Sequence, residues 1–336
     1  DSSVTGVQTC ALPISHLIQE TLNSVVAQSS PDWECIVVDD GSTDATVEVV
    51  TAFAKADSRI HLFQRDDTYT SGGNGARQMG LDRATSDWVM FLDSDDLLGV
   101  DCIKNRLASV EETIDMCVFH TASFKVEVKE TDVYWNMLHK RETCEEYLMR
   151  FLYQDMPWHT TGVLWNAAFL KKIGGWNQEL IAWQDWELHV RALTYNPRVK
   201  ALVVKADNYY RLDVADSIAT KKKSLEYLEA IKKAIESVEG KVLESNMIKE
   251  AKTHLRFLIY RNLIGYPIKW KQMKIPFQIR NSGIQFQSVS PARFLYAYWK
   301  ERVFAITIIK RFLKNKCKLD YYKRMYPETT FLKKRM

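Results

Sequence analysis

Three carboxylates lie within four positions of the stretch FLDSDDLLG: Asp93, Asp95 and Asp96. They follow an apolar run, Trp88–Leu92, which is typical of a buried strand. Like charges this close repel one another, and each resists leaving water. Carboxylates converge favourably when they bind a divalent cation whose remaining ligands are phosphate oxygens. The stretch therefore predicts a Mn²⁺ or Mg²⁺ site, although Asp93 or Asp96 could instead cap the next helix.

A second pair of acids, Asp39 and Asp40, ends another apolar run within the stretch VVDDGSTD. The elements around both clusters alternate in type. The expected helices are 17–28, 45–55 and a segment through Ala84, and the expected strands are 34–38, 60–63 and 88–92. Strands separated by helices form a parallel sheet, and ligands bind beyond the carboxyl ends of its strands. We therefore expect an α/β fold, Rossmann-like, with a mostly parallel sheet and both acidic clusters at one edge.

Three segments carry a resemblance to a known family: ECIVVDDGSTDAT, NGARQMGLDRATSDWVMFLDSDD and KKIGGWNQELIAWQDWELHVRAL, in that order. They resemble the inverting family 2 glycosyltransferases of the GT-A fold. The similarity covers roughly Ser15 to Leu212, and the triple match is specific. It implies a metal-dependent enzyme that moves a sugar from a nucleotide-sugar donor.

The family's opening strand, which ends in Pro-x-Tyr-Asn, is absent. In its place Val4–Ile14 reads like a translated sequencing adapter. We expect residues 1–14 to be a non-native leader that replaces the first strand, with Val7–Leu12 able to fill its slot. Residues 15–215 are then the catalytic domain and residues 216–336 a helical, basic C-terminal region.

The resemblance also implies donor-side roles. Asp39 would contact uracil, and Asp40 would either orient the turn or reach the ribose. Arg77 follows a Gly-rich loop that allows close backbone approach, and it would contact phosphate or base. The family's Asn after this arginine is replaced by Gln78, which leaves the role of Gln78 open. The DxD motif is Asp93-Ser94-Asp95: Asp93 would contact ribose or metal-bound water, Ser94 would lie beside the donor, and Asp95 would be the principal metal ligand.

Inverting transfer needs a base that takes the acceptor's proton from the side opposite the leaving group, hence from another segment. The stretch IAWQDWELHVRA supplies Asp185, which the resemblance assigns as this catalytic base. Glu187 is the alternative acid, and two residues further on it is expected to point away and pair with Arg191.

An aromatic-rich stretch between the motifs is where the family builds its acceptor pocket. Aromatic rings can stack on sugars, but they are also ordinary core material. A lone histidine is likewise often structural, and a Gly-Gly pair can end a helix. The acceptor-site candidates are Trp158, His159, Gly175, Trp176 and Trp183.

Composition adds little until the charge is located. The net charge is +4, yet residues 293–336 alone carry +10. A basic amphipathic tail can lie on an anionic membrane, or it can cover the catalytic domain or a partner. Nucleic acid is not expected, because no binding motif accompanies the charge. Six scattered cysteines, without paired spacing, indicate buried thiols rather than disulfides.

Together these features predict a bacterial, cytoplasmic glycosyltransferase that uses a UDP-sugar. The basic C-terminal region would allow it to lie at the inner face of the membrane. Its acceptor would be a saccharide or lipid-linked hydroxyl in surface polysaccharide or glycolipid assembly. Two alternatives stay open: a sugar-phosphate nucleotidyltransferase, and a non-catalytic nucleotide-binding remnant.

Overall fold

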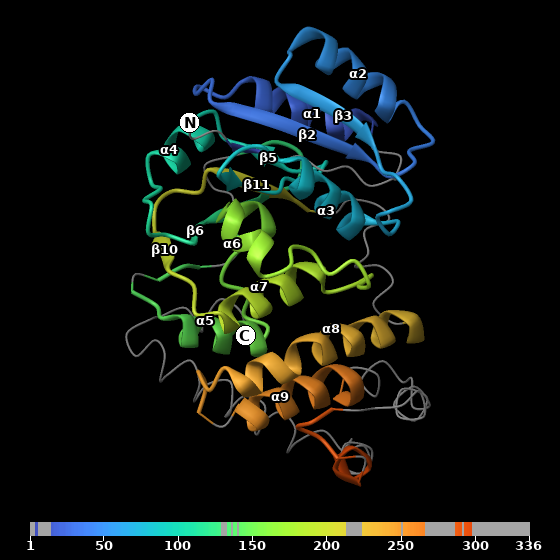
Figure 1. Cartoon of the computed structure of the whole chain (residues 1–336), viewed down its shortest axis with the longest axis vertical. Coiled ribbons are helices and arrows are strands. Elements are labelled where there is room, and N and C mark those ends of the chain that lie inside the picture. The colour runs from blue at the N-terminus through green and yellow to red at the C-terminus, as the bar shows by residue number, and fades with distance from the viewer. Residues whose placement is uncertain are drawn as a thin grey trace. The chain divides into compact units, whose positions relative to one another are not determined.

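The computed structural model describes residues 4–5, 15–128, 133–135, 137–139, 141–212, 224–249, 251–265, 286–290 and 292–297 (Figure 1). The chain divides into two compact units, Asp1–His254 and Leu255–Met336. The first unit contains every element that carries a predicted site residue.

A seven-stranded sheet organises the first unit. Its strands are β1 Val4–Thr5, β2 Trp33–Asp39, β3 Ile60–Gln64, β4 Trp88–Val89, β6 Met116–Phe119, β9 Val163–Asn166 and β10 Val199–Leu202. The order across the sheet is β10-β6-β9-β4-β1-β2-β3. All neighbours are parallel except β9, which is antiparallel to both β4 and β6. The expected α/β fold with a mostly parallel sheet is confirmed.

The slot between β2 and β4 is occupied by β1. Val4 pairs with Trp33 on one side and with Trp88 on the other, both in parallel register. The segment expected in this slot, Val7–Leu12, lies outside the described residues. Residues Val4–Thr5 therefore fill the position between β2 and β4, and the prediction made for Val7–Leu12 is not tested.

A second sheet continues directly from the acidic cluster. It consists of β5 Leu97–Leu98, β7 Thr121–Phe124, β8 Val133–Tyr134 and β11 Asn208–Arg211, in the order β5-β11-β7-β8. Strand β5 pairs antiparallel with β11, so that Leu98 faces Asn208 and Leu97 faces Tyr209. This pairing brings β11, which is 110 residues further along the chain, against the acids.

Helices cover the sheets and complete the core. They are α1 Ser15–Val26, α2 Thr46–Ala56, α3 Gly73–Arg83, α4 Cys102–Leu107, α5 Cys144–Leu152, α6 Ala167–Lys172, α7 Gln184–Thr194 and α8 Leu225–Glu244, with a 3-10 turn at Thr160–Gly162. Helix α1 buries Ile18, Leu22 and Val25 in the same cluster as Val37 of β2. This is the helical spacing that the sequence shows, and burying such a stripe is the main source of stability for a helix of this length.

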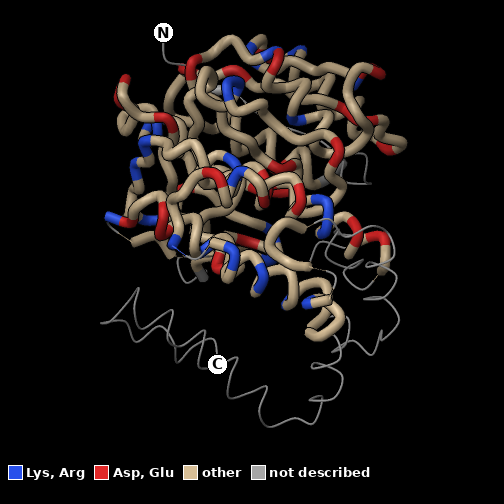
Figure 2. Tube along the Cα trace, turned by 60° about the horizontal axis from the view of Figure 1, so that its bottom comes forward, with Lys and Arg blue, Asp and Glu red and all other residues tan. Residues whose placement is uncertain are grey.

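In the second unit, residues 255–265 and 292–297 are helical, whereas residues 286–290 are not. Helix α9, Ala251–Tyr260, crosses the boundary between the units, and a π-helical turn at Arg261–Gly265 follows it. Most of the basic stretch, residues 298–336, lies outside the described residues. Acidic and basic residues are interspersed over the described chain (Figure 2). Among the described residues, no helix combines the length and apolarity that a membrane crossing requires.

Candidate active site

The acidic cluster lies on a turn just beyond β4. Strand pairing stops at Val89, so the predicted strand Trp88–Leu92 is shorter than expected. Its continuation, Met90–Leu92, is buried but leaves the ladder, and the Asp96 N–H donates to the Asp93 carbonyl at 3.1 Å. Apolar burial therefore extends further than strand pairing, and the carboxylates emerge from a tight turn rather than from extended chain.

Asp96 is the most deeply enclosed acid of the cluster, with a fully buried side chain. Its Oδ1 accepts from the backbone N–H of Arg211 at 3.0 Å, and its Oδ2 accepts from the Thr161 hydroxyl at 3.2 Å. Burial, together with the charges of Asp93 and Asp95, raises its pKa well above the ordinary value. A buried carboxylate held by neutral donors lacks a compensating charge, which a cation would supply.

Three residues could hold that cation. Ligand atoms of Asp93, Asp96 and His159 all lie within 4.8 Å of one another. Burial lowers the pKa of His159, so its imidazole is neutral and available as a ligand. Carboxylate oxygens with one imidazole suit Mn²⁺ and also accommodate Mg²⁺. The residues present therefore fit a divalent cation.

Asp95 is not a member of this three-residue group. Burial and the neighbouring charge of Asp93 raise its pKa to about 6. Its carbonyl oxygen accepts from Arg211 Nε at 2.8 Å, and the Ser94 carbonyl accepts from the Thr21 hydroxyl at 3.0 Å. Both peptide units are thus anchored, and the predicted roles of Asp95 as principal ligand and Ser94 as donor contact stay predictions.

Arg77 joins the acidic turn to α7. Its Nη2 donates to Asp93 Oδ1 at 2.7 Å, and its Nη1 donates to Gln184 Oε1 at 3.2 Å. The guanidinium lies over the Trp176 ring, 4.6 Å from its centroid. Burial opposes ionisation of Asp93, but the charge and the hydrogen bond of the Arg77 guanidinium outweigh it and hold the pKa of Asp93 below its ordinary value. Arg77 therefore presents a fixed positive charge between two separate segments of the chain.

The Gly-rich loop that leads to Arg77 needs its glycines. Gly72 has φ +110°, and a Cβ at Gly75 would collide with the Thr70 carbonyl oxygen. The Asp40 carboxylate accepts from the Gly72 N–H at 2.5 Å and forms an ion pair with Arg65. Of the two roles considered for Asp40, these contacts favour orienting the turn over contacting ribose.

Asp39 is buried at the end of β2, where its carboxylate accepts from the N–H groups of Gly41 and Ser42, each at 3.2 Å. Gln78, which stands in place of the family's asparagine, accepts from the Trp176 N–H at 2.8 Å. Gln78 therefore fixes the neighbouring segment, while the uracil contact of Asp39 stays a prediction.

Asp185 lies in the first turn of α7, as the motif indicated. The turn begins after Trp183, whose φ of +56° is unusual for a side chain of this size. Gln184 is fixed from both sides, because its Nε2 donates to the Leu180 carbonyl at 3.0 Å while its Oε1 accepts from Arg77. Asp185 Oδ1 accepts from its neighbour's N–H at 2.8 Å. The expected pairing of Glu187 with Arg191 is present, Oε1 to Nε, at 2.7 Å.

Asp185 and the acids of the turn act electrostatically on the same two rings, the half-buried Tyr210 and the buried His159. Burial raises the pKa of Tyr210 to about 12, with contributions from Asp96, Asp95, Asp93 and Asp185. The charges of Asp93 and Asp185 also act on His159, whose ring centroid lies 4.8 Å from that of Tyr210. The acids of the turn and Asp185 therefore act on the same two rings, and their membership of one active site stays a prediction.

The acceptor-site candidates separate into two groups. Trp158 is buried against Tyr147 and Phe151, with ring centroids 4.9 and 5.1 Å away, so it is core material. Trp176 is also buried, and its ring packs against the Arg77 guanidinium.

The remaining candidates lie nearer the acids or shape the chain. Gly175 has φ +60° and follows the end of α6, as expected for a helix terminus. His159 faces the acids, and Trp183 is half-buried beside Asp185. An acceptor role for these residues stays a prediction.

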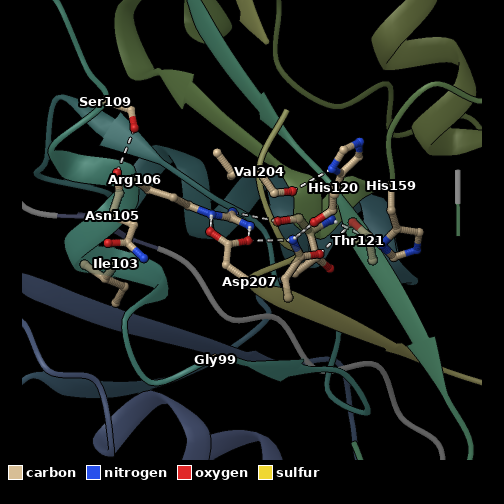
Figure 3. A network of polar contacts seen from close by, with 12 residues as sticks. Gly99, Ile103, Asn105, Arg106, Ser109, His120, Thr121, His159, Val204 and Asp207 are labelled. Carbon is tan, nitrogen blue, oxygen red and sulfur yellow. Dashed lines mark hydrogen bonds and ion pairs between the residues drawn. The ribbon is translucent and has the colours of Figure 1, made fainter. Parts of the chain in front are cut away.

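An ionic network around Arg106 and Asp207 holds the 3-10 turn that carries Thr161 (Figure 3). Arg106, from α4, donates through Nε and Nη2 to the Asp207 carboxylate at 3.0 and 2.7 Å, and through Nη1 to the Thr161 carbonyl at 2.7 Å. The Thr121 hydroxyl donates a hydrogen bond to Asn208 Oδ1 at 2.6 Å. The network fixes the 3-10 turn, and with it the hydroxyl that Thr161 offers to Asp96.

Sequence reasoning missed four residues of this site: Thr161, Gln184, Tyr210 and Arg211. Gln184 stands next to the predicted base, so adjacency was an available signal. Arg211 reaches Asp95 and Asp96 only through the pairing of β5 with β11. No local sequence pattern predicts a contact between residues more than 110 positions apart.

Comparison with known proteins identifies the family of the domain that carries the acidic turn. The model of the family described as "Glycosyl transferase family 2" matches residues 14–172. The chain carries a family 2 glycosyltransferase domain. The match ends before Asp185, so the acceptor side rests on the structure and on the motif.

Two curated relatives share part of the chain. TuaG of Bacillus subtilis (strain 168), whose name assigns it to teichuronic acid biosynthesis, is 34% identical over 126 residues, which are 38% of this chain and 48% of TuaG. The "UDP-Glc:alpha-D-GlcNAc-diphosphoundecaprenol beta-1,3-glucosyltransferase WfgD" of Escherichia coli is 38% identical over 109 residues, which are 32% of this chain and 39% of WfgD. The matches thus span less than half the length of either relative.

Solved structures agree on the fold. S. aureus TarS 1-349 in complex with UDP-GlcNAc matches with a TM-score of 0.61 at 19% identity, covering 77% of this chain and 72% of that chain. At this identity the likeness shows the fold alone, which is GT-A.

Proposed function

We propose that this protein is an inverting glycosyltransferase that moves a sugar from a nucleotide-sugar, most simply a UDP-sugar, to a hydroxyl acceptor. The observation that carries the proposal is the double contact of Arg77, with Asp93 on the acidic turn and with Gln184 next to Asp185. A donor diphosphate and a general base on opposite sides of one sugar need this juxtaposition.

The donor side would work through its charges. Asp93 and Asp96 with His159, and Asp95 by its motif position, would hold Mn²⁺ or Mg²⁺ against the diphosphate. Bound there, the cation would neutralise charge on the departing nucleoside diphosphate. Asp39 would accept from the uracil imide, and Arg77 would add a positive charge beside the phosphates.

On the acceptor side, Asp185 would take the proton of the attacking hydroxyl. The acceptor oxygen then forms its bond to the anomeric carbon as the bond to the diphosphate breaks on the opposite face, which inverts the configuration. His159, Trp183 and Gly175 are the candidates for shaping this side.

The substrate class is suggested by the relatives. WfgD is named for transfer to a lipid-linked GlcNAc diphosphate, and TuaG for teichuronic acid synthesis. TarS binds UDP-GlcNAc in its crystal. We therefore infer a saccharide or lipid-linked acceptor in surface polysaccharide assembly, met at the cytoplasmic face of the membrane.

The test combines two assays. Titration calorimetry with UDP, with and without Mn²⁺, measures donor-side binding. A UDP-release assay with UDP-glucose and UDP-GlcNAc, in the presence of a GlcNAc-diphosphate-lipid, measures turnover. Metal-dependent UDP binding together with UDP release supports a transferase. Binding without release indicates a nucleotide-binding remnant, and diphosphate release from UTP and a sugar phosphate indicates a nucleotidyltransferase.

A further inference from the structure

Helix α1 packs against β5, the strand that follows the acidic turn, and polar side chains line this contact. Thr21 and Ser24 are three residues apart on α1, so they share one face of the helix. The Ser24 hydroxyl accepts from the Leu98 N–H at 3.2 Å. Just beyond the helix, Gln28 Nε2 donates to the Gly99 carbonyl at 2.8 Å. Thr21, which is fully buried, reaches the acidic turn itself.

The Thr21 hydroxyl contacts two carbonyl groups of the acidic turn. Its Oγ1 donates to the Ser94 carbonyl at 3.0 Å and to the Asp96 carbonyl at 2.9 Å. A hydroxyl carries a single hydrogen, so the two carbonyl oxygens share it. A carbonyl that loses its donor away from water destabilises the conformation in which it lies. The two contacts therefore favour the observed conformation of the turn over others.

The other two carbonyl groups of the turn are engaged as well. The Asp93 carbonyl accepts from the Asp96 N–H at 3.1 Å, and the Asp95 carbonyl accepts from Arg211 Nε at 2.8 Å. Arg211 also donates through Nη2 to Glu20 Oε2 of α1 at 2.6 Å. All four carbonyl groups of the turn thus accept hydrogen bonds from the protein. The carboxylates are the oxygen groups that the turn offers to a cation, which suits Mg²⁺ and Mn²⁺.

We propose that Thr21 is a positioning residue of the donor side, whose hydroxyl holds the acidic turn in the conformation that presents its carboxylates to a divalent cation. This deepens the proposed function and rests on it, since it takes the turn as the cation site. Groups that orient the ligands of a metal contribute strongly to its affinity. Thr21 is not assigned any step of the chemistry. Helix α1, whose apolar stripe packs into the core, thereby gains a second role through its polar face.

The experiment compares two substitutions of Thr21 with a matched control. Thr21→Val removes the hydroxyl and keeps a β-branched side chain, whereas Thr21→Ser keeps the hydroxyl. The control is Thr194→Val, because the Thr194 hydroxyl donates to the Arg191 carbonyl within its own helix at 2.7 Å. The Kd for Mn²⁺ is measured by electron paramagnetic resonance of the free ion. The Kd for UDP is measured by calorimetry with and without Mn²⁺.

We expect Thr21→Val to weaken Mn²⁺ binding and Mn²⁺-dependent UDP binding by about 10- to 100-fold, the usual effect of losing a group that orients metal ligands. Binding of UDP without metal should stay within about twofold of wild type. Thr21→Ser should restore most of the Mn²⁺ affinity, and Thr194→Val should match wild type. Wild-type Mn²⁺ affinity in Thr21→Val, or an equal loss of metal-free UDP binding, overturns the proposal.

Amide hydrogen exchange of the metal-free protein gives a readout that does not depend on ligand binding. In Thr21→Val, the Asp96 N–H should exchange at least about tenfold faster, since the turn that it closes is released. The Val37 N–H, in the middle of β2, should keep its wild-type rate and so report that the sheet is intact. Unchanged exchange at Asp96, or the same acceleration at Val37, overturns the proposal. A wild-type protein that binds no Mn²⁺ would defeat the metal-dependent function, while faster exchange confined to Asp96 would still support Thr21 as the residue that holds the turn.

Discussion

The donor side and the acceptor side of this site are built in different ways. The donor side gathers acids from short stretches, VVDDGSTD and FLDSDDLLG, that follow two strands of one sheet. The acceptor side depends on α7, whose first turn is held by Arg77 of α3 and which packs against α8. The donor side is determined by short stretches of consecutive residues, whereas the acceptor side arises from packing between distant segments. Donor chemistry can therefore be retained while the acceptor side changes with its packing partners.

The largest expected effect is that of Asp185→Asn, which should impair the acceptor side and leave the donor side intact. We expect it to lower turnover by about 10²- to 10⁴-fold, the usual contribution of a general base. The Kd for UDP with Mn²⁺ should not change, because Asp185 is placed on the acceptor side. Asp67→Asn, which removes an exposed carboxylate elsewhere, serves as the control. Normal turnover in Asp185→Asn would remove the base assignment.

The donor side is tested by Asp95→Asn and Asp96→Asn, measured by calorimetry. Both should weaken Mn²⁺-dependent binding of UDP by about 10- to 100-fold and reduce turnover at least as much. Asp95 has the motif position, whereas Asp96 lies in the group with Asp93 and His159. If only one variant loses the metal dependence, that carboxylate is the ligand and the other supports the turn.

The link between the two sides is tested by Arg77→Lys. A lysine keeps the charge but cannot reach Asp93 and Gln184 with one planar group. We expect kcat/KM to fall about tenfold, with the thermal unfolding temperature within a few degrees of wild type. A variant at full activity would show that the double contact of Arg77 is dispensable for transfer.

The smallest expected effect concerns the pH dependence of the free energy of unfolding, through the buried His189 of α7. His189 is buried among the rings of Phe151, Trp158 and Trp165, and burial lowers its pKa to about 3, with a further contribution from His159. The unfolded chain binds this proton near pH 6.5, so stability is full above that pH and is lost as the pH falls toward 3. The free energy of unfolding should drop by roughly 1 kcal/mol per pH unit in this window.

That pH dependence is checked by urea unfolding of the wild type and of His189→Phe between pH 6.5 and 5. The variant should lose the contribution of one proton from the slope. His61→Phe, at an exposed position of β3, should retain the wild-type slope. An unchanged slope in His189→Phe would assign the acid sensitivity to other groups.

Much of the donor side could be predicted because its signals are local. The acids of the DxD motif and the Gly-rich loop each depend on a few consecutive residues, and both follow strands of the large sheet, as expected. Strand 88–92 was predicted too long, since apolar burial continues to Leu92 after pairing ends at Val89. Burial and hydrogen bonding are separate properties, and a hydrophobic run reports only the first.

The acceptor side could be predicted only in part. The motif pointed to Asp185, but Tyr210 and Arg211 arrive through β11. Trp158 illustrates the opposite error, because a tryptophan next to a site residue looks available for sugar stacking while it fills the core. The side to which a ring turns is decided by tertiary packing, which a sequence pattern does not encode.

The two-residue strand β1 has a consequence for assembly of the fold. Among the described strands, it alone bonds both β2 and β4, so the β2–β3 pair meets the rest of the large sheet through it. Withdrawing that backbone would uncover two unsatisfied edges in the middle of the molecule. A short extended peptide supplied from outside could then take the vacant place, and a neighbouring copy could donate one. The inserted residues would be held by backbone hydrogen bonds to β2 and β4, so their side chains matter less. This position is therefore suited to complementation by a separate peptide fragment.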